Sequence, residues 1–292
     1  MRESTWAGEP TRLDRVLAEA GLARSRTQAA ELIDRDEVRV NGASVTKASL
    51  RIVADDIVAV TMTERYVSRA AYKLVAGLDE FDIDPAGRIA LDLGASTGGF
   101  SQVLVERGAT AVQAIDVGHG QLAPELLDEP RIRLVEGRNA RELDAENLAH
   151  DTGIAEPPTL VVADLSFISL RLIFPAIAKC AAADADLVLL VKPQFEVGRV
   201  RDGIVTNPVQ WGEALRVAIT AAAENGFAVR GLAHSPITGG HGNREFLTHF
   251  TRDNRGNALD QTEWEARIAA LCADPNPATL VDPRTAERNE TE

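Results

Sequence analysis

Short apolar runs alternate with helix-length segments between residues 88 and 192, and this alternation constrains the fold more than any other feature. The runs have few polar interruptions, and they are 88–93, 111–116, 132–135, 159–164 and 186–192. Near-continuous apolar strands are typical of a parallel sheet that helices bury on both faces. A helix-length segment at 208–225 and two further strands, near 227–234 and 246–250, follow. The pattern predicts a doubly wound α/β domain with an antiparallel strand pair at one end of its sheet.

A smaller module is predicted ahead of this domain, over residues 10–62. Apolar residues recur at helical spacing over 11–20, and Ser25 can cap a second helix. The run Val38-Arg-Val40 alternates like a strand, and Asn41-Gly42 is a hairpin turn signal. Two helices followed by a small sheet make a compact α+β module.

The net charge of -13 argues at first against a nucleic-acid partner, but the charge is unevenly distributed. Residues 1–75 hold 12 Lys/Arg and 11 Asp/Glu, whereas the remainder holds 19 and 33. The acidic excess therefore belongs to the larger part, where its plainest meaning is solubility, and total charge does not decide the partner. No run approaches the roughly 18 uninterrupted apolar residues of a membrane span, and the first residues lack the apolar core of a signal peptide. We expect a cytoplasmic protein with no membrane partner and, because Cys180 and Cys272 make no metal-ligand spacing, no metal site.

A glycine-rich turn follows the first predicted strand of the α/β domain. Asp92-Leu93 ends the strand, and Gly94-Ala-Ser-Thr-Gly-Gly99 opens a helix. Glycine lets the backbone approach a ligand closely, and a helix N-terminus favours negative charge such as a carboxylate. The spacing differs from the Gly-x-Gly-x-x-Gly of dinucleotide sites, and it is not a P-loop. The candidate cofactor contacts in this turn are Gly94, Ala95, Ser96, Thr97, Gly98 and Phe100.

Two polar residues follow the next two strands. Asp116 ends the second strand, where a carboxylate can accept hydrogen bonds from ribose hydroxyls. Asn139 follows the third strand, where it could contact an adenine edge or equally serve as a turn residue. Asp116 and the glycine spacing together favour S-adenosylmethionine as the cofactor.

Four charged residues can meet in one cleft. Asp164 and Lys192 end the fourth and fifth strands, where open α/β sheets place ligand-binding groups. Lys73 lies on the helix before the first strand, and Glu245 lies where the final hairpin resumes. Taken singly each is as well explained by a salt bridge, but together they suit methyl transfer to a ribose 2′-hydroxyl. A lysine can remove the hydroxyl proton if desolvation and a like charge lower its pKa, and we assign that role to Lys192.

The four residues match, in order and context, the Lys-Asp-Lys-Glu tetrad of the FtsJ-like ribose 2′-O-methyltransferases. More narrowly, the chain resembles the TlyA family in several separated segments, which are 68–74, 94–100, 163–169, 191–196 and 242–245. The resemblance covers about residues 10–250. It implies a Rossmann-like class I methyltransferase domain, S-adenosylmethionine as donor, and 2′-O-methylation of cytidines in 16S or 23S ribosomal RNA, or in both. Some members of the family are named haemolysins.

The N-terminal module resembles the S4 RNA-binding domain that this family carries. The resemblance lies in Arg12-Leu-Asp-Arg15, Ser25-Arg26 and Val38-Arg-Val-Asn-Gly42. It implies contact with ribosomal RNA or ribosomal subunits, mainly through RNA phosphates. Scattered arginines are more often a solvated face, so each single contact is only a candidate. The candidates are Arg12, Arg15, Arg24, Arg26, Arg39 and Lys47.

The expected organisation therefore has five parts. They are a flexible N-terminus at 1–9, an S4-like domain at 10–62, a linker at 63–67, the methyltransferase domain at 68–250 and an acidic, disordered tail at 251–292. Two other functions stay open, a non-catalytic RNA-binding factor in ribosome assembly and, less favoured, a membrane-lytic haemolysin. The absence of a long apolar segment and of a basic amphipathic helix weighs against the second.

Overall fold

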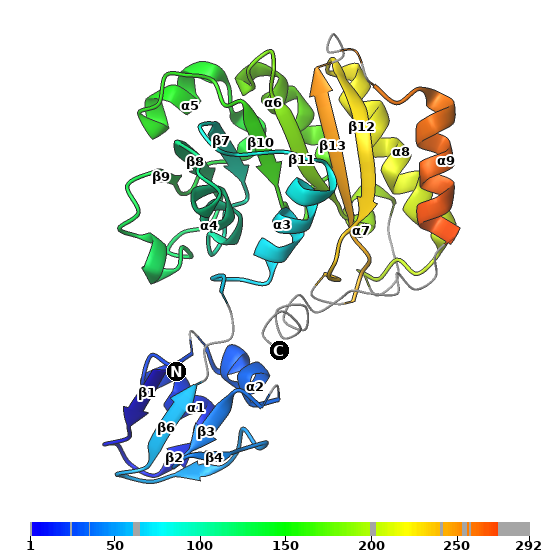
Figure 1. Ribbon diagram of the computed structural model, residues 1–292. Helices are drawn as coiled ribbons and strands as arrows, with labels where there is room; N and C mark the ends of the chain where they lie inside the picture. Colours follow the sequence, from blue (N-terminus) through cyan, green and yellow to red (C-terminus); the bar gives the residue numbers. More distant parts are fainter. Residues whose placement is uncertain are drawn as a thin grey trace, which may run out of the picture. The chain divides into compact units, whose positions relative to one another are not determined.

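The computed structural model forms two compact units, which we call unit 1 (residues 1–65) and unit 2 (residues 66–292) (Figure 1). It describes residues 2–23, 25–34, 36–60, 65–198, 203–239, 242–252, 256 and 258–273. Each unit has its own hydrophobic core, and the two are described separately.

Unit 1 is a small α+β domain, as the sequence predicted. Helices α1 (Leu13–Glu19) and α2 (Arg26–Asp34) pack together over a buried cluster that includes Leu13, Leu17 and Ile33. An antiparallel sheet has the order β1 (Arg2–Thr5), β6 (Ile57–Val60), β3 (Val38–Val40) and β4 (Ala43–Ser44), and β2 (Thr11–Arg12) pairs separately with β5 (Arg51–Ile52). The expected hairpin turn joins β3 to β4, because Asn41 and Gly42 both adopt the positive φ that a tight turn of this kind requires.

The expectation of a flexible N-terminus at 1–9 is wrong for the residues that the structure describes. Arg2–Thr5 forms β1, which pairs antiparallel with β6, and Arg2 lies opposite Val60. Beyond the strand, the backbone amide of Trp6 donates to the carbonyl of Asp56 at 2.9 Å. Backbone pairing to an open sheet edge does not need an apolar side-chain pattern, so the polar run Arg-Glu-Ser-Thr gave no signal.

Unit 2 contains a seven-stranded mixed sheet. The strand order is β12-β13-β11-β10-β7-β8-β9, with β7 to β11 parallel and β13 antiparallel to both of its neighbours. The strands are β7 (Ile89–Leu93), β8 (Ala111–Ile115), β9 (Ile132–Val135), β10 (Leu160–Ala163), β11 (Asp186–Val191), β12 (Phe227–His234) and β13 (Phe246–Arg252). This confirms the Rossmann-like prediction. The order reverses at β7, which lies between β8 and β10, and open α/β sheets bind ligands at such a point.

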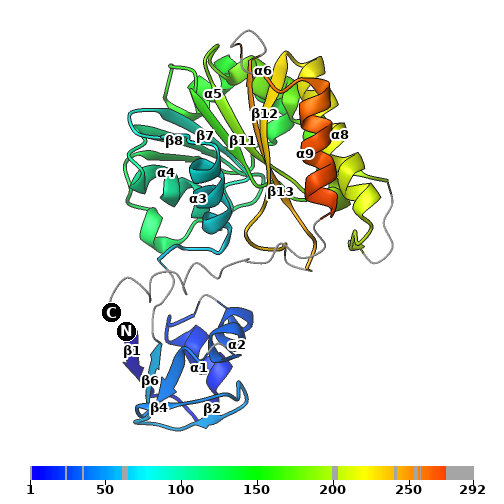
Figure 2. The same ribbon diagram turned by 45° about the vertical axis from the view of Figure 1, so that its right-hand side comes forward.

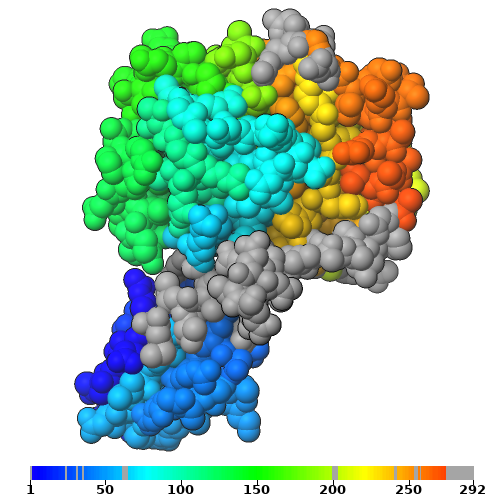
Figure 3. Space-filling view, in the orientation of Figure 1, coloured from blue at the N-terminus to red at the C-terminus, as the bar shows by residue number. Residues whose placement is uncertain are grey.

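Helices cover both faces of this sheet. On one face α3 (Ala70–Glu80) and α4 (Gly99–Glu106) enclose one buried cluster, and Figure 3 shows α3, in cyan, over the middle of unit 2. Residue 77 of α3 is glycine, and a Cβ there would meet Val188 at 3.0 Å, so α3 packs closely on the strands. The other face is covered by α5 (Ala145–Thr152), α6 (Phe174–Cys180) and α8 (Pro208–Glu224).

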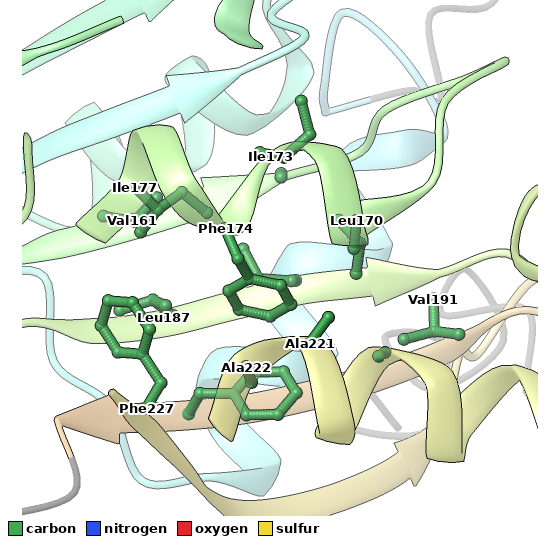
Figure 4. Packing of buried hydrophobic residues seen from close by; sticks show 14 of the residues in the cluster. Val161, Leu170, Ile173, Phe174, Ile177, Leu187, Val191, Ala221, Ala222 and Phe227 are labelled. Carbon is green, nitrogen blue, oxygen red and sulfur yellow. The ribbon is translucent and has the colours of Figure 1, made fainter. Parts of the chain in front are cut away.

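The second cluster centres on phenylalanine rings between α6, α8 and the sheet (Figure 4). Phe174 is fully buried; its ring centroid lies 5.4 Å from that of Phe250, edge to face, and 6.1 Å from that of Phe227. Short helical segments complete the unit, and they are η1 (Pro124–Leu126), η2 (Ala140–Glu142), η3 (Leu170–Leu172) and α7 (Pro193–Glu196).

The expected domain boundaries differ from the observed ones at both ends of unit 2. Tyr66 and Val67, expected in the linker, are buried in the cluster that α3 and α4 enclose. At the other end β13 continues to Arg252, and α9 (Gln261–Ala273) packs on α8, as Figure 2 also shows. Ile268 of α9 is 1% exposed, so this part of the expected tail contributes to the core. The rest of the expected tail, 274–292, lies outside the described residues.

Phe174 anchors the α6 face of unit 2, and its truncation tests that core. We expect Phe174→Ala to lower the free energy of unfolding by about 3–5 kcal/mol, because the buried ring leaves a cavity. Phe167→Ala removes a ring that is 90% exposed and should cost less than about 1 kcal/mol. Urea denaturation followed by circular dichroism measures both, and equal losses would contradict the packing described here.

Candidate active site

The carboxyl ends of three neighbouring strands carry the predicted functional residues. The glycine-rich turn follows β7, Asp164 follows β10 and Lys192 follows β11. Since these strands are parallel neighbours in the sheet, the three segments emerge at the same edge. The edge coincides with the reversal of strand order at β7.

The structure brings the four charged residues together. The Nζ of Lys73, from α3, lies 2.6 Å from Oε2 of Glu245 and 3.3 Å from Oδ2 of Asp164. The other oxygen of Asp164, Oδ1, lies 2.6 Å from Nζ of Lys192. Asp164 therefore links the two lysines, and Glu245, just before β13, pairs with Lys73 among the described residues.

The electrostatics of the cluster distinguish its members. Burial alone would lower the pKa of Lys73, but the attraction of Asp164 and Glu245 outweighs it, and the pKa of Lys73 is raised. Burial alone would raise the pKa of Asp164, but the two lysines outweigh it, and the pKa of Asp164 is lowered. All four side chains are at most 13% exposed, so each charge depends on its partners for stabilisation.

The glycine-rich turn is shaped to bring backbone close to a ligand. Gly94 and Gly98 have φ of 84° and 89°, and Ser96 also has a positive φ of 48°. A Cβ at Gly98 would meet Leu122 and Leu126 at 2.6 and 2.5 Å, so only glycine fits there. Among the other candidates, Thr97 is partly exposed, whereas Ala95 and Phe100 are buried in the core beside α4.

Asp116 and Asn139 both have local partners. Asp116 accepts hydrogen bonds from the backbone amides of Ser96 and Gly118, at 2.8 and 2.7 Å, and so ties the turn to the end of β8. Asn139 accepts from the amide of Arg141 at 3.1 Å and caps η2, which is the turn role that the sequence left open. Carboxylate oxygens can accept further bonds, so a ribose contact by Asp116 stays a prediction.

Sequence reasoning missed two residues of the loop after β10. The hydroxyl of Ser166 accepts a hydrogen bond from Nζ of Lys192 at 3.0 Å. The next residue, Phe167, has a φ of 65°, a strained conformation for a bulky residue, and its side chain is 90% exposed. Its ring lies 5.3 Å from that of Phe195, in α7, which directly follows Lys192. The signals that could have found them were their position just after a functional aspartate and their place in segment 163–169, which resembles the TlyA family.

A further carboxylate joins α7, which follows Lys192, to the segment after Asp164. Glu196 accepts hydrogen bonds from the hydroxyl of Ser169 at 2.6 Å and from the amide of Leu170 at 2.8 Å. Burial raises the pKa of Glu196, against the effect of these bonds. Helix α7 and the segment after Asp164 are thereby fixed to each other.

The candidate RNA contacts of unit 1 differ in their surroundings. Arg12 and Arg26 both pair with the buried Asp14, whereas Arg15 pairs with the exposed Glu19. Arg39 is half-buried on β3 and Lys47 is exposed, and Arg24 lies outside the described residues. The structure thus brings Arg12 and Arg26 together, and of the described candidates only these two share a partner.

Comparison with known proteins agrees with this geometry. The family model of FtsJ-like methyltransferases matches residues 66–252, and that of the S4 domain matches residues 11–58. The chain is 46% identical to the 16S/23S rRNA (cytidine-2′-O)-methyltransferase TlyA of Mycobacterium tuberculosis, over 81% of this chain and 88% of the relative. It is 38% identical to Hemolysin A of Brachyspira hyodysenteriae, over 82% of this chain and 99% of the relative.

A solved structure shows the same architecture. A protein from Streptococcus thermophilus with a provisional hemolysin name superposes with a TM-score of 0.71 at 33% identity, covering 98% of this chain and all of that one. None of the described helices is long and apolar enough to cross a membrane. With its S4 domain, its seven-stranded sheet and its extensive identity to these relatives, the chain belongs to the TlyA family of S-adenosylmethionine-dependent, FtsJ-like methyltransferases.

Proposed function

We propose that this protein methylates the 2′-hydroxyl of cytidine in 16S or 23S ribosomal RNA, or in both. The observation that carries the proposal is the buried cluster of Lys73, Asp164, Lys192 and Glu245 beside the glycine-rich turn. It is supported by the printed activity of the Mycobacterium tuberculosis relative and by the S4 domain of unit 1. Such a substrate, free or within ribosomal subunits, would place the enzyme's work in the cytoplasm.

The residues around the turn fit S-adenosylmethionine. A Cβ at Gly94 would approach Leu165 at 3.0 Å and the carbonyl of Asp164 at 3.4 Å, so glycine keeps the turn open next to the charged cluster. Asp92 lies under the turn with one carboxylate oxygen, Oδ1, that has no hydrogen-bond partner in the described structure. We assign the nucleoside ribose to Asp116, whose carboxylate is held at the carboxyl end of β8. When bound, the cofactor supplies an electrophilic methyl group on a cationic sulfur.

Of the two lysines, Lys192 is the better general base. Lys73 contacts two carboxylates, which hold its proton firmly, as its raised pKa indicates. Lys192 contacts one carboxylate, Asp164, and the neutral hydroxyl of Ser166. In its neutral form Nζ of Lys192 would accept the 2′-hydroxyl proton as the ribose oxygen takes the methyl group that the bound cofactor would supply. Asp164 then stabilises the ammonium that forms.

Phe167 is the residue we assign to the target base. An exposed ring in a strained backbone conformation is costly unless it has a function, and nucleobases stack readily on aromatic side chains. The ring follows Asp164 by three positions and contacts Phe195, which follows Lys192 by three. Stacking there would hold the nucleotide beside the base that takes its proton.

Replacing the assigned base tests the proposed chemistry. We expect Lys192→Ala to slow single-turnover transfer of tritiated methyl groups to unmodified ribosomal RNA by about 10²–10⁴-fold, because the hydroxyl proton loses its acceptor. Lys179→Ala, on the exposed side of α6, is the matched control and should match the wild type. Transfer by Lys192→Ala at the wild-type rate would refute the assignment, and RNA binding without transfer by the wild type would indicate an assembly factor instead.

The role assigned to Phe167 can be tested by measuring the kinetics toward RNA and the affinity for the cofactor in the same variants. Loss of a stacked base costs about 1–3 kcal/mol, so Phe167→Ala should lower kcat/KM for RNA by roughly 5–150-fold. The affinity for S-adenosylmethionine, measured by calorimetry, should not change, and Phe167→Trp should restore most of the activity. Leu172→Ala, a half-exposed apolar residue of η3, serves as control. A change in cofactor affinity with unchanged kinetics toward RNA would contradict the assignment.

Asp92 predicts a pH dependence of stability. Burial, opposed by the Ser101 hydrogen bond and aided by the charges of Asp164 and Asp116, raises the pKa of Asp92 to about 7, from 3.8. Between these values the folded state holds the proton and the unfolded state does not, so stability falls as the pH rises through this window. The loss is on the order of 4 kcal/mol once the pH exceeds both values.

Asp92→Asn should remove this loss, since an amide does not ionise. Thermal unfolding measures this effect. From pH 5 to pH 8, the Tm of Asp92→Asn should fall less than the Tm of the wild type. Asp128→Asn, which alters an exposed carboxylate, should keep the wild-type difference. An equal fall in Tm for Asp92→Asn and the wild type would contradict the prediction, because the Asp92 carboxyl group would then be ionised at both pH values.

A further inference from the structure

Lys192 has two oxygen partners of different kinds. Its Nζ lies 2.6 Å from Oδ1 of Asp164, and it donates a hydrogen bond to Oγ of Ser166 at 3.0 Å. The side chain of Lys192 is 9% exposed, whereas Ser166 is exposed. Lys73, by contrast, contacts the carboxylates of Asp164 and Glu245. At Lys192 a neutral hydroxyl therefore takes the place that a second carboxylate takes at Lys73.

A hydroxyl in this place suits a lysine that must lose its charge before it can act. A second carboxylate would attract the ammonium and oppose the loss of its proton. The hydroxyl of Ser166 carries no charge, so it opposes that loss less, yet its oxygen still accepts a hydrogen bond. Ser166 can therefore hold Nζ of Lys192 in place without fixing the proton on it.

Two hydrogen bonds determine where the lone pair of a neutral lysine points. The neutral Nζ carries two N–H groups and one lone pair, arranged tetrahedrally with the bond to Cε. If one N–H is directed at Asp164 and the other at Ser166, rotation about the Cε–Nζ bond stops, and the lone pair takes the remaining direction. With Asp164 alone, the second N–H and the lone pair can exchange places, and Nζ is held from one side only.

The segment that carries Ser166 is fixed to the helix that follows Lys192. Lys192 is the N-cap of α7, and Glu196 ends this helix. Glu196 accepts hydrogen bonds from the hydroxyl of Ser169 at 2.6 Å and from the amide of Leu170 at 2.8 Å. The hydroxyl of Ser166 is thereby kept at a constant distance from Nζ, and a group held in this way positions its neighbour more precisely than a free loop does.

We propose that Ser166 is a positioning residue for Lys192. Its hydroxyl, together with Asp164, holds Nζ so that the lone pair of the neutral amine faces the ribose 2′-hydroxyl. The proposal rests on the proposed function, since it takes Lys192 as the base. The proton passes from the ribose oxygen to Nζ, and Ser166 keeps its own hydrogen throughout.

Ser166→Ala separates positioning from binding. With RNA and S-adenosylmethionine both saturating, its single-turnover transfer of tritiated methyl groups should be about 5–20-fold slower than that of the wild type, because Nζ is less well aligned. The KM for RNA and the affinity for S-adenosylmethionine should not change. Ser166→Thr keeps the hydroxyl and should restore most of the rate. Thr220→Ala, which removes an exposed hydroxyl from α8, is the matched control and should equal the wild type.

A double variant shows whether Ser166 acts through Lys192. Ser166→Ala combined with Lys192→Ala should transfer methyl groups as slowly as Lys192→Ala alone, because no amine is left to position. A further 5–20-fold loss in the double variant would overturn the role. A wild-type rate in Ser166→Ala would also overturn it, and a faster rate would mean that the hydroxyl donates to the lone pair and blocks it. A raised KM for RNA at an unchanged rate would make Ser166 a substrate contact instead.

Transfer by the wild type keeps this inference apart from the proposed function. If the wild type methylates ribosomal RNA and Ser166→Ala does so at the same rate, the positioning role is wrong and the function holds. If the wild type transfers no methyl group to any ribosomal RNA, the proposed function fails and this inference fails with it. The Tm of Ser166→Ala should equal that of the wild type, because the residue is exposed, so a slower rate is not a loss of folded protein.

Discussion

The site of unit 2 depends on one carboxylate that two ammonium groups share. Asp164 contacts Lys73 through one oxygen and Lys192 through the other, and each of these side chains is nearly buried. Without Asp164, Lys73 would keep Glu245 as its partner, but the nearly buried ammonium of Lys192 would lose its carboxylate, at a cost of several kcal/mol. The interaction also fixes α3 to the ends of β10 and β11. It can form because Gly77 lets α3 approach the sheet and because parallel pairing sets β10 beside β11.

The sequence predicted this arrangement at the positions where a polar residue ends an apolar run of the predicted sheet. A polar residue at the end of an apolar run has few interpretations, so Asp164 and Lys192 could be placed at one edge from the pattern alone. Lys73 and Glu245 lie outside the parallel strands, and their assignment depended on the family resemblance and on topology. The boundaries were less predictable: Tyr66, and Ile268 in α9, are buried by contacts with elements far away in the chain, which local composition does not encode.

Side-chain partners were predicted least well, for a physical reason. The direction of Phe167 follows from a positive φ that no propensity scale assigns to phenylalanine, and the contact of Ser166 with Lys192 depends on two loops meeting. Asn139 shows the same limit, because its cap of η2 and an adenine contact fit the sequence equally. Asp14 reads as an ordinary helix residue until the fold brings Arg12 and Arg26 to it.

The charge distribution divides the work between the two units. In unit 2 the two lysines of the cluster are matched by Asp164 and Glu245, so the cluster carries no net charge and offers little attraction to phosphate. The chain beyond residue 75 is strongly acidic, which further opposes a polyanion. Under the proposed function, phosphate contacts fall mainly to unit 1, whose residues 1–65 hold 10 Lys/Arg and 11 Asp/Glu and therefore repel a polyanion far less. A ribose hydroxyl is uncharged until its proton leaves, so a neutral, buried cluster is a better environment for it than a charged cluster. Under the proposed function, this distribution of charge favours contact with phosphates in unit 1 and chemistry on the sugar in unit 2.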